Sequence, residues 1–402
     1  MSFNKKRRAS GEGEPWPAPG RHDATAIADR YNQETSAAVE QSVSSGRGRP
    51  KLVGLLANED PAGDVYARMT KRACDKVGIE YELRRPARLD LEDGVISANA
   101  DPSVHGLIVY YPVFGGGKDG YLRDVISDTK DVEGLSHRYC YALYHNIRYI
   151  EEGTKKKCVL PCTPLACIKV LENLGAYNLQ RPVGKQLSGR KAIIYNRSEV
   201  VGRPLAAMLA NDGALVYSVD EFGMLVYSAG AVHGAIKVEE TSVSPDEALA
   251  SADIVVGGVP AKAFKLPAEK LKRGAICINV AQHMNFGDGV EAKCALVPAV
   301  GKVTIAILAR NLLRLYDNFH APPATRVALS PRTLVAAKRP TVREVGGVLA
   351  ISAVALGIFY AGYRYGSNAA AAASKALLRA GYPSGYANLH GAPARVGYAR
   401  PA

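Results

Sequence analysis

The sequence predicts the α/β class, in which buried parallel strands alternate with helices. Two short apolar runs, residues 191–195 and 213–219, flank the good helix formers of residues 204–210. Runs that are apolar throughout are typical of strands covered on both faces, as in a parallel sheet. A length of 402 residues is enough for two or three domains with a large core.

The same alternation continues along most of the chain. Helix-compatible segments are expected at residues 22–45, 66–77, 161–174, 204–210 and 306–315, the second of them ended by Gly78. Strands are expected at residues 52–56, 79–83, 106–112, 191–195, 213–219, 252–257 and 274–280. Residues 1–20 are polar, contain three prolines and are predicted to be disordered.

The positive charge lies at the two ends of the chain. The formal net charge is +13, of which Lys5–Arg8 contribute +4 and residues 321–402 contribute +9, so residues 11–320 carry no net charge. A basic face for DNA or RNA is therefore not expected on the body, and no nucleic acid partner is predicted. Lys5–Arg8 fit a solvated, disordered start better than a nuclear signal.

Cysteine usage points to a reducing compartment. The seven cysteines are scattered and odd in number, with no C-x-x-C pair and no histidine at metal-ligand spacing, so no metal site is predicted. Small buried core residues are the expected role, including for Cys162. No apolar segment stands at the N-terminus, and a cytoplasmic location is expected.

A polar turn joins strand 191–195 to the helix that follows. Asn196 occupies the first tight-turn position, where Asn is the best non-glycine residue for a left-handed conformation, and Gly202 is the only glycine in the turn. Strand, turn, helix, strand and then Asp220 is the order of a Rossmann-like dinucleotide-binding unit. Such a turn sets backbone N–H groups and a helix N-terminus against a pyrophosphate. A buried βαβ unit without a nucleotide also fits this spacing.

The charge of Asp220 favours NAD as the cofactor. A carboxylate at this position accepts hydrogen bonds from the adenosine ribose and repels a 2′-phosphate. Arg197 complicates this interpretation, since a guanidinium near the turn can hold a phosphate and so favour NADP. A helix cap or turn residue is the alternative role for Asp220.

Several motifs resemble those of the methylenetetrahydrofolate dehydrogenase/cyclohydrolase family. The turn from Asn196 reads N-R-S-E-V-V-G-R-P, which is similar to the family's G-R-S-x-x-V-G-x-P. Residues 130–134 (K-D-V-E-G) and 160–165 (L-P-C-T-P-L) look like its K-D-V-D-G and P-C-T-P segments, and residues 252–257 and 274–280 look like two of its strands. The matches keep their order over roughly residues 21–320. The likeness is greatest to the fungal NAD-dependent branch that has only the dehydrogenase.

The resemblance implies two α/β domains around a cleft. Its domain limits are a folate-binding catalytic domain at residues 21–180, completed by a helix at 306–319, and a Rossmann-like NAD-binding domain at residues 181–305. It also implies a homodimer. The reaction implied is hydride transfer from 5,10-methylenetetrahydrofolate to NAD in one-carbon metabolism.

The resemblance also implies the site residues. Tyr66 and Glu133 are expected as catalytic residues that stack on and hydrogen-bond the folate, and Tyr110 and Pro112 complete the substrate pocket. The cofactor residues implied by the turn, the acid and the loop before the last helix are Asn196, Arg197, Ser198, Val201, Gly202, Asp220, Gly301 and Thr304. The loop at Gly301 is one residue shorter than in the family and has Lys302 in place of a proline.

Two departures from the family predict loss of the cyclohydrolase. The lysine that follows the helix tyrosine by four residues is Thr70 here, and its glutamine partner is Tyr110. Lys71 is rotated by about 100° around the helix and points elsewhere. A hydroxyl cannot replace the titratable amine that activates water. An NADP-dependent or bifunctional enzyme remains the first alternative, and a non-catalytic, membrane-tethered folate- or nucleotide-binding protein is the second.

The tail, residues 320–402, matches nothing in the family. It is basic and rich in Ala and Gly, and residues 345–363 form an uncharged run of 19 residues, which spans a bilayer only marginally. A membrane helix and a low-complexity Ala/Gly extension fit this run equally well. Contact with a membrane is expected only through these residues, and an organelle membrane is then the alternative to a cytoplasmic location.

Overall fold

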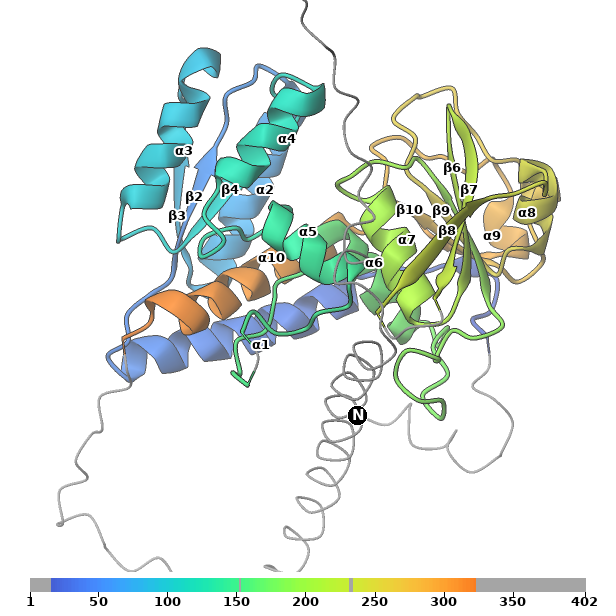
Figure 1. Ribbon diagram of the computed structural model, residues 1–402, viewed down its shortest axis with the longest axis horizontal. Coiled ribbons are helices and arrows are strands. Elements are labelled where there is room, and N and C mark those ends of the chain that lie inside the picture. Colours follow the sequence, from blue (N-terminus) through green and yellow to red (C-terminus); the bar gives the residue numbers. More distant parts are fainter. Residues whose placement is uncertain (1–15, 152, 231–233, 323–402) are drawn as a thin grey trace, which may run out of the picture. The chain divides into compact units, whose positions relative to one another are not determined.

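The protein was analysed as a computed structural model that describes residues 16–151, 153–230 and 234–322. These residues belong to one compact unit that holds two sheets (Figure 1). The predicted α/β class is confirmed, with a Rossmann-like parallel sheet as its main feature. The predicted membrane segment at residues 345–363 and the basic residues Lys5–Arg8 lie outside the described residues. Within those residues, no helix is long and apolar enough to cross a membrane.

The first sheet has three parallel strands in the order β3-β2-β4. These strands are β2 (Lys51–Leu55), β3 (Glu80–Arg84) and β4 (Gly106–Val109). The helices of this half are α1 (Thr25–Ser44), α2 (Pro61–Val77), α3 (Leu91–Ala100), α4 (Gly116–Val125) and α5 (His137–Tyr144), with a 3₁₀ turn at Arg88–Asp90. The Asp60 side chain caps α2 by accepting from the Ala62 N–H (2.9 Å), and Gly78 ends it with φ +79°.

The second sheet has eight strands in the order β1-β11-β10-β9-β5-β6-β7-β8. Its strands are β1 (Gly20–Arg21), β5 (Lys191–Tyr195), β6 (Leu215–Asp220), β7 (Gly223–Ala229), β8 (Ile236–Glu240), β9 (Ile254–Gly257), β10 (Ile276–Asn279) and β11 (Ala295–Val297). The remaining helices are α6 (Cys162–Asn173), α7 (Gly202–Asn211), α8 (Pro245–Ser251), α9 (Val290–Lys293) and α10 (Gly301–Leu315), with a 3₁₀ turn at Ala268–Lys270. A π-helical turn, Tyr316–His320, continues α10.

Two features of the second sheet correct the sequence-based predictions. Strand β7 runs antiparallel to β6, and β8 runs antiparallel to β7, so the strand pairings are parallel only from β1 to β6 in the spatial order of the sheet. Gly20, predicted to be disordered, and Arg21, predicted to begin the first domain, instead join this sheet as β1, which pairs with β11. The Trp16 indole donates to the Gly274 carbonyl, and the Arg190 guanidinium lies 4.0 Å from the Trp16 ring centroid.

One continuous apolar core links the two sheets. It includes Leu52 and Ile108 of the first sheet, Ile194 and Ile276 of the second, and Leu308 of α10. Figure 1 shows α10 lying beside α1, and α10 also contacts α2 and α6. The seven cysteines are free thiols, and all except Cys140 are buried, as expected for core residues. The predicted limits of the two domains stay predictions.

A buried amide ties α10 to two loops. The Asn311 side chain is 2% exposed, and its Nδ2 donates to the carbonyls of Val132 and Leu160, at 2.9 Å in each case. These carbonyls belong to the loop that carries Glu133 and to the segment that leads into α6. Asn311 therefore fixes both segments against the same helix.

Replacing Asn311 with Ala will destabilise the protein by about 2 to 4 kcal/mol, because two buried carbonyls lose their donor. Urea unfolding monitored by circular dichroism measures this change in the free energy of unfolding. Asn318→Ala is the matched control, since the Asn318 amide donates to the Lys157 carbonyl (3.2 Å) at an exposed position. Equal losses in the two variants would contradict the role assigned to Asn311.

Candidate active site

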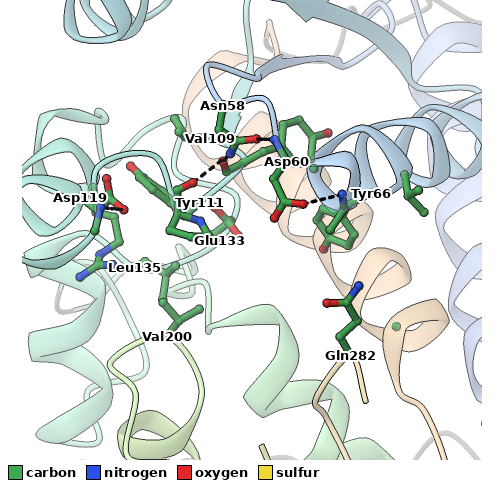
Figure 2. Close-up of a pocket in the computed structure, with 18 of the residues that line it drawn as sticks. Asn58, Asp60, Tyr66, Val109, Tyr111, Asp119, Glu133, Leu135, Val200 and Gln282 are labelled. Atoms are coloured by element: carbon green, nitrogen blue, oxygen red, sulfur yellow. Dashed lines mark hydrogen bonds between the residues drawn. The ribbon is translucent and has the colours of Figure 1, made fainter. Parts of the chain in front are cut away.

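One cavity of about 960 Å³ is lined by residues from both halves of the chain. Figure 2 shows Tyr66, Tyr111 and Glu133 on one side of this cavity, with Val200 and Gln282 facing them. The predicted folate residues Tyr66, Tyr110, Pro112 and Glu133 all line it, as does Gly301 of the predicted cofactor set. The structure therefore brings together residues far apart in the sequence.

The loop at residues 130–134 is shaped by two buried charged side chains. Lys130 Nζ donates to the carbonyls of Ala98 (3.0 Å), Asn99 (2.8 Å) and Asp101 (2.6 Å), which closes the C-terminal end of α3. The Asp131 carboxylate accepts from the backbone N–H groups of residues 133, 134 and 136, at 2.8 to 3.1 Å. Both charges thus have hydrogen-bond partners although they are buried. This scaffold sets the direction in which the Glu133 side chain leaves the loop.

Glu133 has an unusual protonation equilibrium. Its pKa is raised from 4.5 to about 8, because burial and the nearby Asp131 charge both raise it while Arg123 opposes the shift. The desolvation effect is the largest of the three. Glu133 is therefore largely protonated at neutral pH, and it can either donate or accept a hydrogen bond in the cavity.

Two tyrosines that line the cavity pack close to a buried threonine of α2. The Tyr66 ring meets the Tyr110 ring edge-on, with centroids 5.7 Å apart and planes at 81°. Thr70 is fully buried one turn after Tyr66, and its hydroxyl donates to the Tyr66 carbonyl at 2.9 Å. The Lys71 Nζ pairs with Asp75 at 2.9 Å on the exposed side of α2. Lys71 thus points away from the cavity, as its helical position predicted.

Several residues that sequence reasoning missed hold the end of β4 in place. Asn58 Nδ2 donates to the carbonyls of Tyr110 (2.7 Å) and Pro112 (2.9 Å). The buried Asp119 carboxylate accepts from the N–H groups of residues 113, 114 and 115, at 2.9 to 3.0 Å. A carboxylate just after a glycine run is a common turn-binding pattern and could have indicated Asp119. Asn58 had no comparable signal, since its acceptors lie more than fifty positions away.

In the predicted cofactor turn, the backbone at Asn196 lies very close to the backbone at Gly202. Asn196 has φ +90°, and its Nδ2 donates to the Gly258 carbonyl at 2.6 Å, which links the ends of β5 and β9. A Cβ on Gly202 would lie 1.9 Å from the Asn196 carbonyl oxygen, so only glycine fits there. The Ser198 hydroxyl accepts from the Val201 N–H at 3.2 Å beside the start of α7. The chain here forms a narrow cradle of the kind that admits a pyrophosphate.

Asp220 and Arg197 are bonded to each other at the end of β6. Arg197 Nη2 lies 3.2 Å from Asp220 Oδ1 and also donates to the carbonyls of Ser218 (3.1 Å) and Gly223 (2.7 Å). The Phe222 N–H donates to the same Oδ1 at 2.9 Å. Within the part of the chain that the structure describes, these contacts all involve Asp220 Oδ1 and leave Oδ2 without a partner. The guanidinium is held by the protein instead of being presented to a phosphate.

The last two predicted cofactor residues lie at the start of α10. Gly301 is the first residue of this helix and lines the cavity. Thr304 is 6% exposed, and its hydroxyl lies 3.3 Å from the Val300 carbonyl oxygen and 3.4 Å from the Thr163 hydroxyl. Thr304 is thus a packing contact between α10 and α6. Cys162 is also buried beside α10, and burial raises the pKa of its thiol well above the usual value, which does not suit a nucleophile.

Comparisons with known proteins agree with this geometry. The family model described as tetrahydrofolate dehydrogenase/cyclohydrolase, catalytic domain, matches residues 22–133, and the NAD(P)-binding domain of that family matches residues 161–320. The chain is 48% identical over 300 residues to methylenetetrahydrofolate dehydrogenase [NAD(+)] of Dictyostelium discoideum, covering 74% of this chain and 95% of that protein. It is 46% identical over 304 residues to the protein of the same name from Saccharomyces cerevisiae, covering 73% and 95%.

A solved structure is similar over the same region. The NAD-dependent 5,10-methylenetetrahydrofolate dehydrogenase from Saccharomyces cerevisiae superimposes with a TM-score of 0.71 at 45% sequence identity. The match covers 75% of this chain and 98% of that chain.

The raised pKa of Glu133 predicts a pH-dependent stability. Between pH 5 and 8 the folded protein holds a proton that the unfolded chain has lost, so stability falls as pH rises. Glu133→Gln removes this pH-dependent loss of stability. We expect the loss to be on the order of 1 to 3 kcal/mol, because the carboxyl partly faces the cavity and solvent there reduces the effect of burial. Urea unfolding of both proteins at pH 5, 6, 7 and 8 measures it. Glu269→Gln, at an exposed acid, is the control, and parallel curves for the wild type and Glu133→Gln would contradict the prediction.

Proposed function

The chain belongs to the tetrahydrofolate dehydrogenase/cyclohydrolase family, and we propose that it oxidises 5,10-methylenetetrahydrofolate to the 5,10-methenyl form with NAD. The observation that carries this function is the shared cavity, which Tyr66 and Glu133 line from one half and Val200 and Gly301 from the other. A folate and a nicotinamide placed there would meet. The protein is thus an oxidoreductase of one-carbon metabolism, and we infer that its two halves act as two domains around this cleft.

The reaction breaks the C–H bond of the bridging methylene, and the hydride leaves with both electrons. NAD, when bound, supplies the nicotinamide carbon that accepts this hydride. The two flanking nitrogens share the positive charge left on the folate, so no proton has to be removed. The protein needs only to position the folate and exclude water. Tyr66 can stack on the flat part of the folate, and Glu133 can hydrogen-bond the amino and N–H groups of the pterin.

The chain's own residues fit NAD. The turn from Asn196 can close on the start of α7 only because Gly202 has no side chain, and a tight turn at a helix N-terminus can hold a pyrophosphate. Asp220 can accept from the ribose, and Arg197 is occupied by Asp220 and by two carbonyls. A 2′-phosphate would therefore meet a carboxylate and not a free guanidinium.

The lysine that the family resemblance implies for hydrolysis of the methenyl product is replaced by Thr70 in this chain. Thr70 is buried and bonded to the Tyr66 carbonyl, and the Tyr110 ring fills the space beside it. Burial raises the pKa of the Tyr110 hydroxyl, so it stays protonated and is a poor base. We infer that the enzyme is a dehydrogenase without cyclohydrolase activity.

The function is tested with purified full-length protein, methylenetetrahydrofolate and either NAD or NADP. We expect methenyl product to accumulate with NAD and no formyl product to appear. Asp220→Asn should raise the KM for NAD roughly tenfold, because a charged acceptor is worth about 1.5 kcal/mol more than a neutral one. Asp246→Asn is the control. Asp246 lies on α8 and pairs with Lys270, so this variant removes a carboxylate outside the predicted site. Formyl product would contradict the absence of cyclohydrolase, and no reduction of either cofactor would favour a non-catalytic binding protein.

We propose that two copies pair through β8. This strand is the last of the second sheet and pairs with β7 on one side only, within the described residues. Val238 at its centre is 46% exposed, and Lys237 and Glu239 flank it. An antiparallel pairing of two copies about Val238 would set Lys237 of each copy opposite Glu239 of the other. The edge is thus self-complementary in charge, which supports a homodimer.

Charge exchange on β8 tests this pairing. Lys237→Glu sets two acids against each other, and Glu239→Lys sets two lysines, so each should raise the dimer dissociation constant roughly tenfold. The double variant restores both pairs and should dimerise like the wild type. Sedimentation velocity of the 42.8 kDa chain over a concentration series measures this. A monomeric wild type, or single variants that dimerise as tightly as it does, would contradict the proposed interface.

A further inference from the structure

Gly54 leaves a gap in the middle strand of the first sheet. It lies in β2, between β3 and β4, with Leu83 as its partner on one side and Ile108 on the other. A Cβ on Gly54 would lie 2.6 Å from the Tyr81 hydroxyl, 3.0 Å from Tyr110 Cε2 and 3.2 Å from the Tyr110 hydroxyl. Its φ is not positive, so backbone conformation does not require glycine here. The requirement comes from the two tyrosines.

Tyr81 and Tyr110 meet in this gap from opposite sides. Tyr81 belongs to β3 and Tyr110 directly follows β4, so these residues come from the two strands that flank β2. Their hydroxyl oxygens are 2.8 Å apart and form a hydrogen bond. Any side chain on residue 54 would separate them. Gly54, Tyr81 and Tyr110 therefore form one structural unit, which we call the tyrosine bridge.

The tyrosine bridge ends at the folate cavity. Tyr110 lines the cavity and contacts the Tyr66 ring edge-on. The Tyr110 carbonyl is fixed separately by Asn58. Tyr110 is thus held at its backbone from one side and at its hydroxyl by Tyr81. Among the described residues, Tyr81 is absent from the lining of the cavity, so it can act there only through Tyr110.

We propose that Tyr81 is a positioning residue of this enzyme, which holds Tyr110 and, through its ring, Tyr66 in the orientation that receives the folate. The proposal rests on the function proposed above. A tyrosine ring without a tether at its hydroxyl can turn about two side-chain torsions. Tethering it at both ends removes this freedom before the substrate arrives, which favours a near-attack geometry. The effect should appear in the kinetics of the folate and not in those of NAD.

The test compares Tyr81→Phe, Tyr110→Phe and the double variant with the wild type. We expect Tyr81→Phe to lower kcat/KM for methylenetetrahydrofolate about fivefold while the KM for NAD changes less than twofold. Because either variant alone breaks the bond between the two hydroxyls, the double variant should be no worse than the more impaired single variant. Effects that multiply in the double variant, or a kcat/KM for Tyr81→Phe within twofold of the wild type, would overturn the proposal.

Tyr177→Phe is the matched control. The Tyr177 hydroxyl is buried and donates to Asp212 at 2.8 Å, away from the cavity. This variant loses a comparable hydrogen bond, so its thermal midpoint should fall at least as much as that of Tyr81→Phe while kcat/KM is kept. A loss of kcat/KM that follows the thermal midpoint across all variants would show a merely structural role and overturn the proposal.

A second pair of variants tests the gap itself. Gly54→Ala should impair folate kinetics more than Tyr81→Phe, and adding Tyr81→Phe to Gly54→Ala should recover part of the loss because the nearest clash is removed. No recovery would contradict a bridge through Tyr81. Two measurements distinguish failure of the proposed function from failure of the tyrosine bridge.

In the activity assay, a wild type that reduces neither cofactor refutes the proposed function. In calorimetry, binding of tetrahydrofolate by Tyr81→Phe that is as tight as in the wild type, or tighter, refutes the tyrosine bridge.

Discussion

The buried amide of Asn311 is the interaction on which the site depends most. Its two hydrogen bonds end on Val132 and Leu160, the first next to Glu133 and the second at the approach to α6. The helix that carries Asn311 begins at Gly301 on the cavity and packs on α1, α2 and α6. One helix thus sets the folate loop, the connection to the second sheet and part of the cofactor side in fixed register. A cavity between two sheets needs such a shared element, because loops alone would not hold its walls to within a fraction of an ångström.

Burial of charge at residues 130–134 explains why the cavity carries a protonated acid. An unpaired buried charge is unfavourable by several kcal/mol, yet Lys130 and Asp131 each have three backbone partners that offset this. Among the described residues, no such set of donors reaches the Glu133 carboxyl, and Asp131 adds a negative charge nearby. Arg123 is the compensating charge, but its side chain is also paired with Glu199 at 3.0 Å. Desolvation therefore outweighs attraction, and the pKa rises. Donors of a bound pterin would reverse part of this balance.

The sequence was most informative where a local pattern decides the structure. The buried strands β5, β9 and β10 follow from apolar runs, and the direction of Lys71 follows from helix geometry alone. What it missed depends on partners distant in the chain. β1 has only two residues and is a strand because β11 lies beside it. The antiparallel strands β7 and β8 were not predicted, and their place in the sheet is set by pairing with β6 and with each other. The tyrosine bridge requires the spatial order β3-β2-β4, which no sequence period contains.

The pairing of Arg197 with Asp220 shows how a carboxylate can select a cofactor although its charge is compensated. At 3.2 Å the guanidinium offsets most of the long-range field of Asp220, so net repulsion of a phosphate cannot be the main effect. Short-range bonding decides instead. The donors of Arg197 Nη2 are directed at Asp220 and at two backbone carbonyls, and its Nε is buried. The Arg197 side chain is only 10% exposed, so little of the guanidinium is accessible to a phosphate. A ribose hydroxyl can donate to Asp220 Oδ2 without displacing anything, and this difference favours NAD over NADP.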